Sequence, residues 1–200
     1  AGRLTFTDPN YDFLGNSLRY SVSSESNDKP DLGYENSIVS ASIGTAFEQY
    51  RDVDVNLGLG LSYDDLRTES SASKNLKKQS GAFTEFAANY GFTYDKRNRA
   101  FMPTSGSVVS FGQSLPIYAD KSFISNTVTA STYKSFNEDV VGSGKIFLSA
   151  VSGLGSDDVR LSKRKGLSNS RLRGFERNKV GPVDGADHIG GNYAAAINFE

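Results

Sequence analysis

The sequence predicts an all-β protein, an antiparallel transmembrane β-barrel of which these 200 residues form a part. Apolar and polar residues alternate along the chain, in runs of about 10–15 residues that exceed the ~5–6 usual in soluble sheets. Apolar residues make up 37% of the chain, below the ~45–50% of typical soluble domains. Alternation alone fits a soluble sandwich equally well. Strand length and composition decide between the two folds and favour the barrel, which closes without free edges.

Composition and charge exclude several classes. The 22 basic and 23 acidic residues leave no electrostatic footprint for nucleic acid. Cysteine is absent, so disulfides and thiolate metal sites are excluded. No run approaches the ~18 apolar residues of a transmembrane helix, and the first ten residues lack the features of a signal peptide. Because the chain starts within a strand-like run and without Met, we expect a fragment.

We expect about nine strands, and no segment with the spacing of an amphipathic helix. The clearest alternation lies in "DVDVNLGLGLSYDD" and "FTEFAANYGFTYD". Leu57, Leu59, Tyr90, Phe92, Ile197 and Phe199 should share the convex, lipid-facing side of one curved sheet that is open at both edges. The strands are expected near residues 3–8, 17–22, 36–48, 53–64, 85–95, 105–115, 122–135, 143–154 and 192–200.

The connections between strands indicate two different ends. Barrels of this class have short periplasmic turns and longer extracellular loops. By this alternation "EQYRD" (48–52), "DKRNRAFMPTSG" (95–106) and "FNED" (136–139) lie together on the periplasmic side. The 64–81 stretch and the final loop are then extracellular. Because Pro103 cannot donate to a ladder, the following strand should begin only near Gly106.

The connection at 155–190 is unusually long for a loop between two strands. Loops of this length are uncommon and are usually functional or disordered. Its "RLRGF" sequence suits a tip that folds back into a polar lumen. Gly174 permits a sharp turn, Phe175 can wedge the tip, and Arg173 can donate to a carboxylate on the wall.

The loop motifs resemble those of the BamA family, the outer-membrane β-barrel assembly factors of the Omp85-type superfamily. "NYGFTYDKRNRAFMPTSGSVVSFG" (89–112) and "TDPNYDFLGNSL" (7–18) are also similar to the family, so the resemblance covers essentially the whole chain. The family often has a Gly-Gly pair shortly before the arginine, where this chain has only Gly166. The motifs are "LRGF" (Leu172, Arg173, Gly174, Phe175), "GP" (Gly181, Pro182) and "GGN" (Gly190, Gly191, Asn192).

The resemblance implies a sixteen-stranded barrel, of which this chain covers about the fourth to the twelfth strand. Residues 1–200 would form a single partial barrel domain without POTRA repeats, and 155–190 would plug the lumen from the extracellular side. The family's wall carboxylate falls eight residues beyond Asn192, at Glu200. We therefore expect a bidentate pair between Arg173 and Glu200.

The implied function is that of the central insertase, which folds and inserts β-barrel proteins into the outer membrane of a Gram-negative bacterium. Its partners would be unfolded outer-membrane clients, accessory assembly lipoproteins, outer-membrane lipids and lipopolysaccharide. Alternatives are a TamA-type or two-partner-secretion translocator and a passive porin-like channel. A porin would need acidic and basic residues facing each other across an eyelet, whereas an insertase loop needs one arginine locked to the wall.

Enzymatic readings are weaker, and we expect no catalytic residue, cofactor or metal. "VGSGK" (141–145) lacks the spacing of a phosphate-binding loop and reads as a strand start. "GLGSDD" (153–158) lacks the ligand spacing of a calcium loop. His188, the only histidine, has no nucleophile motif beside it. The basic stretch 163–173 should meet lipopolysaccharide or the lumen wall rather than RNA.

Overall fold

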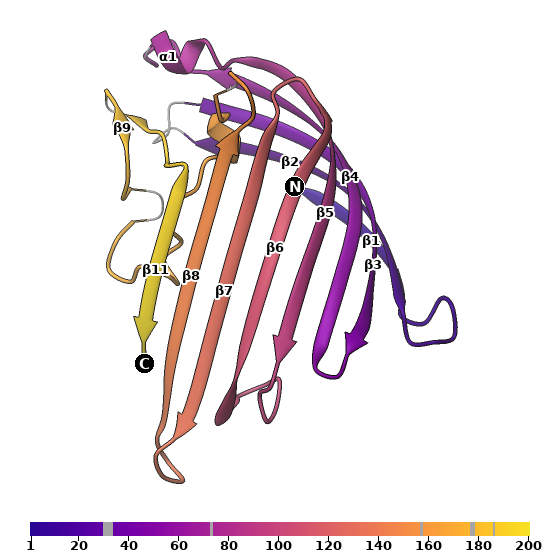
Figure 1. Ribbon diagram of the computed structural model, residues 1–200. Helices are drawn as coiled ribbons and strands as arrows, with labels where there is room; N and C mark the ends of the chain where they lie inside the picture. Colours follow the sequence, from indigo (N-terminus) through magenta and orange to yellow (C-terminus); the bar gives the residue numbers. More distant parts are fainter. Residues whose placement is uncertain (30–33, 73, 157, 177–178, 186) are drawn as a thin grey trace.

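A computed structural model describes residues 1–29, 34–72, 74–156, 158–176, 179–185 and 187–200. These residues form one curved, nine-stranded antiparallel sheet in which each long strand pairs with the next along the chain (Figure 1). Strands β1 and β11 are its two edges, which confirms the expected open sheet and excludes a sandwich for the described residues. The strands are β1 (Gly2–Asp8), β2 (Ser17–Lys29), β3 (Tyr34–Tyr50), β4 (Val53–Thr68), β5 (Gly81–Asp95), β6 (Ser105–Ala119), β7 (Phe123–Ser135), β8 (Val141–Gly153) and β11 (Tyr193–Phe199).

Several strands extend beyond their expected bounds. The alternation in β2 fades after Val22, because every residue from Ser23 to Lys29 is polar. Pairing nevertheless continues to Lys29, opposite Tyr34 of β3. The partner strand therefore maintains the extended conformation where the hydrophobic pattern no longer indicates it.

The two faces of the sheet differ as the alternation predicts. Leu57, Leu59, Phe92, Ile197 and Phe199 are all exposed. Tyr90 shares their parity, and its ring lies 5.9 Å from that of Phe92. The opposite face carries Ser, Asn, Gly and acidic residues and contacts the 154–192 loop. That loop reaches β4 and β11 at the same time, which is possible only from the inside of the curve, so the polar face is concave and the apolar face convex.

The turns between β3 and β4 and between β5 and β6 lie side by side at one end of the sheet. Asp95 N–H donates to the Asp52 carbonyl at 3.0 Å, and Lys96 Nζ lies 2.8 Å from the Asp52 carboxylate. Strand β6 begins at Ser105, directly after the Pro103 segment. These contacts confirm the predicted grouping for two of the three turns, and the antiparallel strand order places the turn at 136–139 at the same end.

Helical structure in the described residues is confined to single turns. The α-helix α1 (Lys74–Lys77) and a 3-10 turn (Leu161–Lys163) both lie at the loop end of the sheet. A four-residue helix is too short to produce the periodicity that sequence analysis detects. No helix in the described ranges is long and apolar enough to cross a membrane.

The packed core also lies at the loop end. A two-residue hairpin, β9 (Val183–Asp184) with β10 (Asp187–His188), forms the second sheet within the long loop. Apolar side chains from the connections between the long strands pack onto the polar face of the sheet at this end. One buried cluster contains Tyr34, Leu66, Ala72, Leu76 and Leu161, and a second contains Phe123, Val151 and Val159.

Candidate functional site: the docked loop

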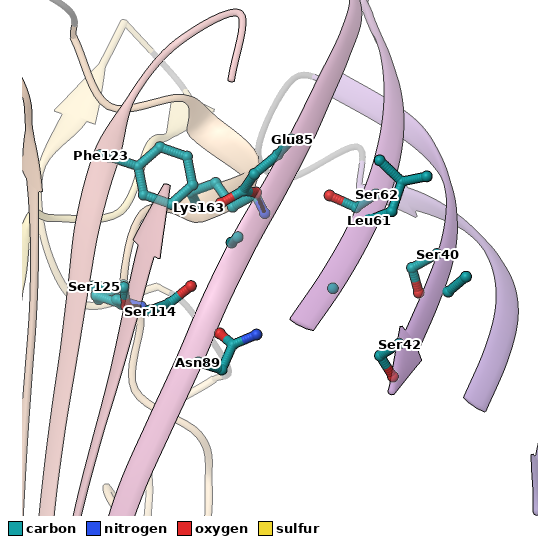
Figure 2. A pocket seen from close by; sticks show the side chains of 14 residues that line it. Ser40, Ser42, Leu61, Ser62, Glu85, Asn89, Ser114, Phe123, Ser125 and Lys163 are labelled. Atoms are coloured by element: carbon teal, nitrogen blue, oxygen red, sulfur yellow. Dashed lines mark hydrogen bonds and ion pairs between the residues drawn. The ribbon is translucent and has the colours of Figure 1, made fainter. Parts of the chain in front are cut away.

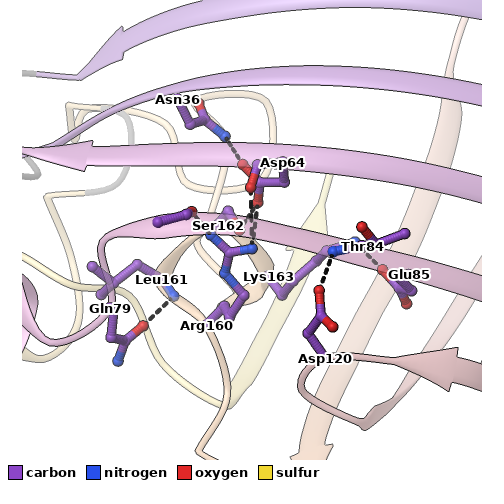
Figure 3. Close-up of polar contacts among 11 residues, drawn as sticks. Asn36, Asp64, Gln79, Thr84, Glu85, Asp120, Arg160, Leu161, Ser162 and Lys163 are labelled. Carbon is purple, nitrogen blue, oxygen red and sulfur yellow. Dashed lines mark hydrogen bonds and ion pairs between the residues drawn. The ribbon is translucent and has the colours of Figure 1, made fainter.

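The loop between β8 and β11 is anchored to the concave face by a buried arginine. Arg160 Nη1 lies 3.5 Å from an Asp64 carboxylate oxygen, and both side chains are 4% exposed. The guanidinium also donates to the Asp64 carbonyl at 3.4 Å (Figure 3). A second donor of the same group meets the Gly81 carbonyl at 3.4 Å. Its carbon stacks 3.4 Å from the centroid of the Phe83 ring. Burial lowers the pKa of Arg160 and Asp64 opposes this shift, but an arginine stays charged in proteins.

Neighbouring residues complete this anchor. Ser162 Oγ donates to Asp64 Oδ2 at 2.6 Å, and Asn36 Nδ2 donates to Oδ1 at 3.4 Å. The Leu161 N–H donates to Gln79 Oε1 at 2.9 Å (Figure 3). The Leu161 side chain belongs to the first buried cluster, so polar and apolar contacts fix the same loop segment. We call residues 159–165 the loop root.

Two lysines extend the root across the polar face. Lys163 Nζ lies 2.5 Å from Glu85 Oε2 on β5. Lys165 Nζ donates to Ser125 Oγ on β7 at 2.7 Å. The basic stretch 163–173 was expected at lipopolysaccharide or the lumen wall, and these lysines contact the concave face of the sheet.

The structure brings Arg173 and Glu200 together at a place away from the loop root. Arg173 Nη2 contacts Glu200 Oε1. The predicted bidentate geometry is wrong, because Lys145 Nζ on β8 occupies the other carboxylate oxygen at 2.5 Å. The Arg173 side chain is 74% exposed and that of Glu200 is 35% exposed. The carboxylate therefore has two cationic partners in a solvated setting.

Arg171 is a further contact that sequence reasoning missed. Its guanidinium carbon lies 3.5 Å from the centroid of Phe147, and its carbonyl accepts a hydrogen bond from Asn198 Nδ2 at 3.1 Å. Phe147 has the parity of the polar face of β8. The sequence offered one signal for this contact, an aromatic residue at a position where the other strands carry small polar residues.

The remaining "LRGF" residues shape the tip. Gly174 has φ +84°, the left-handed conformation expected of a sharp turn. Leu172 is half-buried. Phe175 is 56% exposed, and its expected role as a wedge stays a prediction. In this segment Arg171 contacts the wall by stacking on Phe147. We call residues 170–175 the loop tip.

The other two motifs organise the return of the chain into β11. Ile189 N–H donates to the carbonyl of the proline at 3.1 Å, across the β9–β10 hairpin. Lys165 pairs with the second glycine of "GGN" through two backbone hydrogen bonds of 2.7 and 2.9 Å. The asparagine carbonyl accepts from Val151 N–H at 2.8 Å. These motif residues are Gly181, Pro182, Gly190, Gly191 and Asn192, and the structure places them in backbone turns and pairing rather than in side-chain chemistry.

A cavity of about 280 Å³ lies between the loop root and the concave face (Figure 2). Strands β3 to β7 supply most of its wall, and Lys163 and Lys165 come from the root. Among the residues with described positions, no group of three His, Asp or Glu side chains is arranged to hold a metal ion. Asp157 of the acidic 153–158 stretch lies outside the described residues.

An antiparallel sheet with an apolar convex face, a polar concave face and a long loop held inside defines a segment of an outer-membrane β-barrel protein. The chain belongs to the Omp85 superfamily, whose domain matches residues 1–200. This membership confirms the family resemblance of the loop and turn motifs.

Three relatives show the extent of the similarity. The outer membrane protein assembly factor BamA of Neorickettsia risticii is 27% identical over 172 residues, which are 84% of this chain and 23% of that protein. The human sorting and assembly machinery component 50 homolog is 26% identical over 124 residues, 60% of this chain and 26% of that protein. The crystal structure of BamA from Haemophilus ducreyi lacking POTRA domains 1–3 has a TM-score of 0.81 at 23% identity, covering 98% of this chain and 43% of that chain. The chain thus spans about a quarter of these curated relatives.

Proposed function

We propose that this chain is the central barrel segment of an insertase that folds and inserts β-barrel proteins into the outer membrane of a Gram-negative bacterium. A bacterial and a human relative both carry names of assembly components. The bacterial relative aligns with 84% of the chain and the human one with 60%, which favours the bacterial branch.

The observation that carries the proposal is the loop held across the concave face at two separate places. Arg160 binds Asp64 on β4, and Arg173 contacts Glu200 beyond β11. A loop fixed to both sides of the curve blocks the lumen, whereas a passive channel needs an open eyelet. We propose that "LRGF", "GP" and "GGN" serve this docking, and that the work of the barrel involves no bond chemistry, cofactor or metal.

The same arrangement suggests the orientation and the partners. The short turns at 51–52, 96–104 and 136–140 would face the periplasm, and the loop would enter the lumen from the extracellular side. Unfolded outer-membrane proteins would be the clients, accessory lipoproteins would bind on the periplasmic side, and the convex face would contact lipid and lipopolysaccharide.

The test uses Arg173→Ala in the full-length protein, reconstituted in vesicles of outer-membrane lipids. We expect client barrels to fold several-fold more slowly. Arg173→Lys should rescue part of the rate, because it keeps the charge that contacts Glu200 but not the hydrogen-bonding geometry of the guanidinium. Arg51→Ala, at a turn arginine that is 94% exposed, is the matched control and should fold clients at the wild-type rate.

A wild-type rate for Arg173→Ala would contradict the proposal. If that variant lost secretion of a soluble passenger instead, the barrel would be a translocator. Increased solute permeation with unchanged client folding would indicate a porin-like channel.

A further inference from the structure

The cavity beneath the loop root has an unusual lining. Its wall is rich in hydroxyl groups from four different strands, and Figure 2 shows these side chains around Asn89 and Glu85. Hydroxyl and amide groups donate as well as accept hydrogen bonds. The hydroxyl-bearing residues are Ser40, Ser42, Ser62, Ser114 and Ser125.

The cavity also holds a positive charge without a matching carboxylate. Lys163 is balanced by Glu85 at 2.5 Å. Lys165 donates to Ser125 Oγ at 2.7 Å, and across the described ranges no carboxylate lies within 4.0 Å of its Nζ. An ammonium carries three N–H donors, so further donor capacity remains at the cavity. Burial, and secondarily Lys163, lower the pKa of Lys165, which shows that the site disfavours a bare cation.

We propose that this cavity binds a small oxyanion of the inorganic phosphate class. The ammonium of Lys165 supplies charge-assisted donors, and the serine hydroxyls and the Asn89 amide can satisfy the remaining oxygens. The Glu85 carboxylate also lines the cavity and opposes an anion, but Lys163 neutralises it. The cavity opens on the concave face, away from lipid, so the ligand is water-borne phosphate and not a lipid headgroup.

Such a ligand would also act on the loop. Lys163 and Lys165 come from the root, while Ser114 and Ser125 come from β6 and β7. An anion between them would bridge the root to the sheet and offset the repulsion between the two lysines. The inference is independent of the insertase proposal, because phosphate binding and client folding are measured separately.

The experiment titrates inorganic phosphate into the full-length protein in phospholipid-free detergent micelles and follows binding by calorimetry and by ³¹P NMR line width. Wild-type protein should show saturable binding of one phosphate. Lys165→Met should reduce the affinity at least tenfold. Glu85→Gln should raise it several-fold, because the change removes the opposing carboxylate and frees Lys163. Lys134→Met, at an exposed lysine of β7 near the opposite end of the sheet, should leave it within twofold of wild type.

Two further measurements keep the result decisive. Far-UV circular dichroism checks the folding of each variant. Ser125→Ala, which removes the hydroxyl partner of Lys165, should also weaken binding, and it keeps the test possible if a charge variant fails to fold. Soluble dihexanoyl phosphatidic acid should not displace the phosphate. The proposal is overturned by an absence of saturable binding, by equal affinity in wild type and Lys165→Met, or by displacement with the phosphatidic acid.

Discussion

Arg160 and Asp64 are 96 positions apart in the sequence, yet their side chains meet at 3.5 Å and are each 4% exposed. The ionic contact at the loop tip, between Arg173 and Glu200, is largely solvated. The loop therefore has a desolvated root and a hydrated tip. Because water and salt screen the tip far more than the root, the two contacts should respond differently to substitution.

The first prediction concerns the root. Arg160→Met should weaken the docking of the loop by about 3–5 kcal/mol, since it leaves the Asp64 carboxylate buried without its cation. Native-state hydrogen exchange of the Leu161 amide, which is hydrogen-bonded to Gln79, measures this opening directly.

The matched control for the root is Arg164→Met. Arg164 lies 3.3 Å from Asp158, whose side chain is 64% exposed, and donates to the Val159 carbonyl at 3.3 Å. Its removal leaves no buried charge, so this change should cost only about 1–2 kcal/mol. The double variant Arg160→Met with Asp64→Leu should recover part of the lost stability, because two apolar side chains replace a buried ion pair. Equal exchange rates in the Arg160 and Arg164 variants would show that burial of the pair has no energetic role.

The second prediction concerns the tip. Glu200→Gln removes the carboxylate that both Arg173 and Lys145 contact, so the tip should become more mobile while the root stays docked. A spin label introduced as Phe175→Cys, at an exposed tip position, should give a narrower spectrum. Glu35→Gln, at an exposed position of the distant strand β3, should leave the spectrum unchanged.

The third prediction concerns the turn before β6. Gly106 has φ +93°, and a Cβ there would lie 2.1 Å from the Lys96 carbonyl oxygen. Gly106→Ala should therefore destabilise the barrel by more than the ~1–3 kcal/mol of a strained backbone conformation alone. Gly112→Ala, on the same strand with open space around its Cβ, is the control and should change the urea midpoint little. Similar midpoints for both variants would contradict the described turn.

The fourth prediction concerns pH. Lys165 faces Lys163 and Glu85, and burial, followed by Lys163, lowers its pKa in the docked loop from the ordinary value of 10.5. Between the lowered pKa and 10.5 the undocked loop binds more protons than the docked one, so docking strengthens as pH rises through this window. The protection factor of the loop amides, which is the intrinsic exchange rate divided by the observed rate in phosphate-free buffer, should rise accordingly, and Lys165→Met should remove that part of the dependence. A slope that persists in this variant would assign the effect to other groups.

Much of the architecture follows from local pattern. Alternation at Leu57 and Leu59, or at Ile197 and Phe199, indicates strands and their apolar face, because side chains alternate across any extended chain. Once consecutive strands pair as antiparallel neighbours, every second connection must lie at the same end. Pro103 then marks the strand start, since it has no N–H to donate. Alternation does not predict the polar end of β2, because pairing with the neighbouring strand rather than its own residue pattern keeps it extended.

Residue type and short spacing are enough to predict the alternating strands, the two unlike faces and the arginine motif of the loop. The folded chain was needed to show that Arg160 meets Asp64, that Lys145 shares Glu200, and that Arg171 stacks on Phe147 at the tip. Those contacts join residues of distant strands, and their geometry depends on register and on the curvature of the sheet. Local sequence carries no information about which side chains a curved sheet brings face to face across its interior.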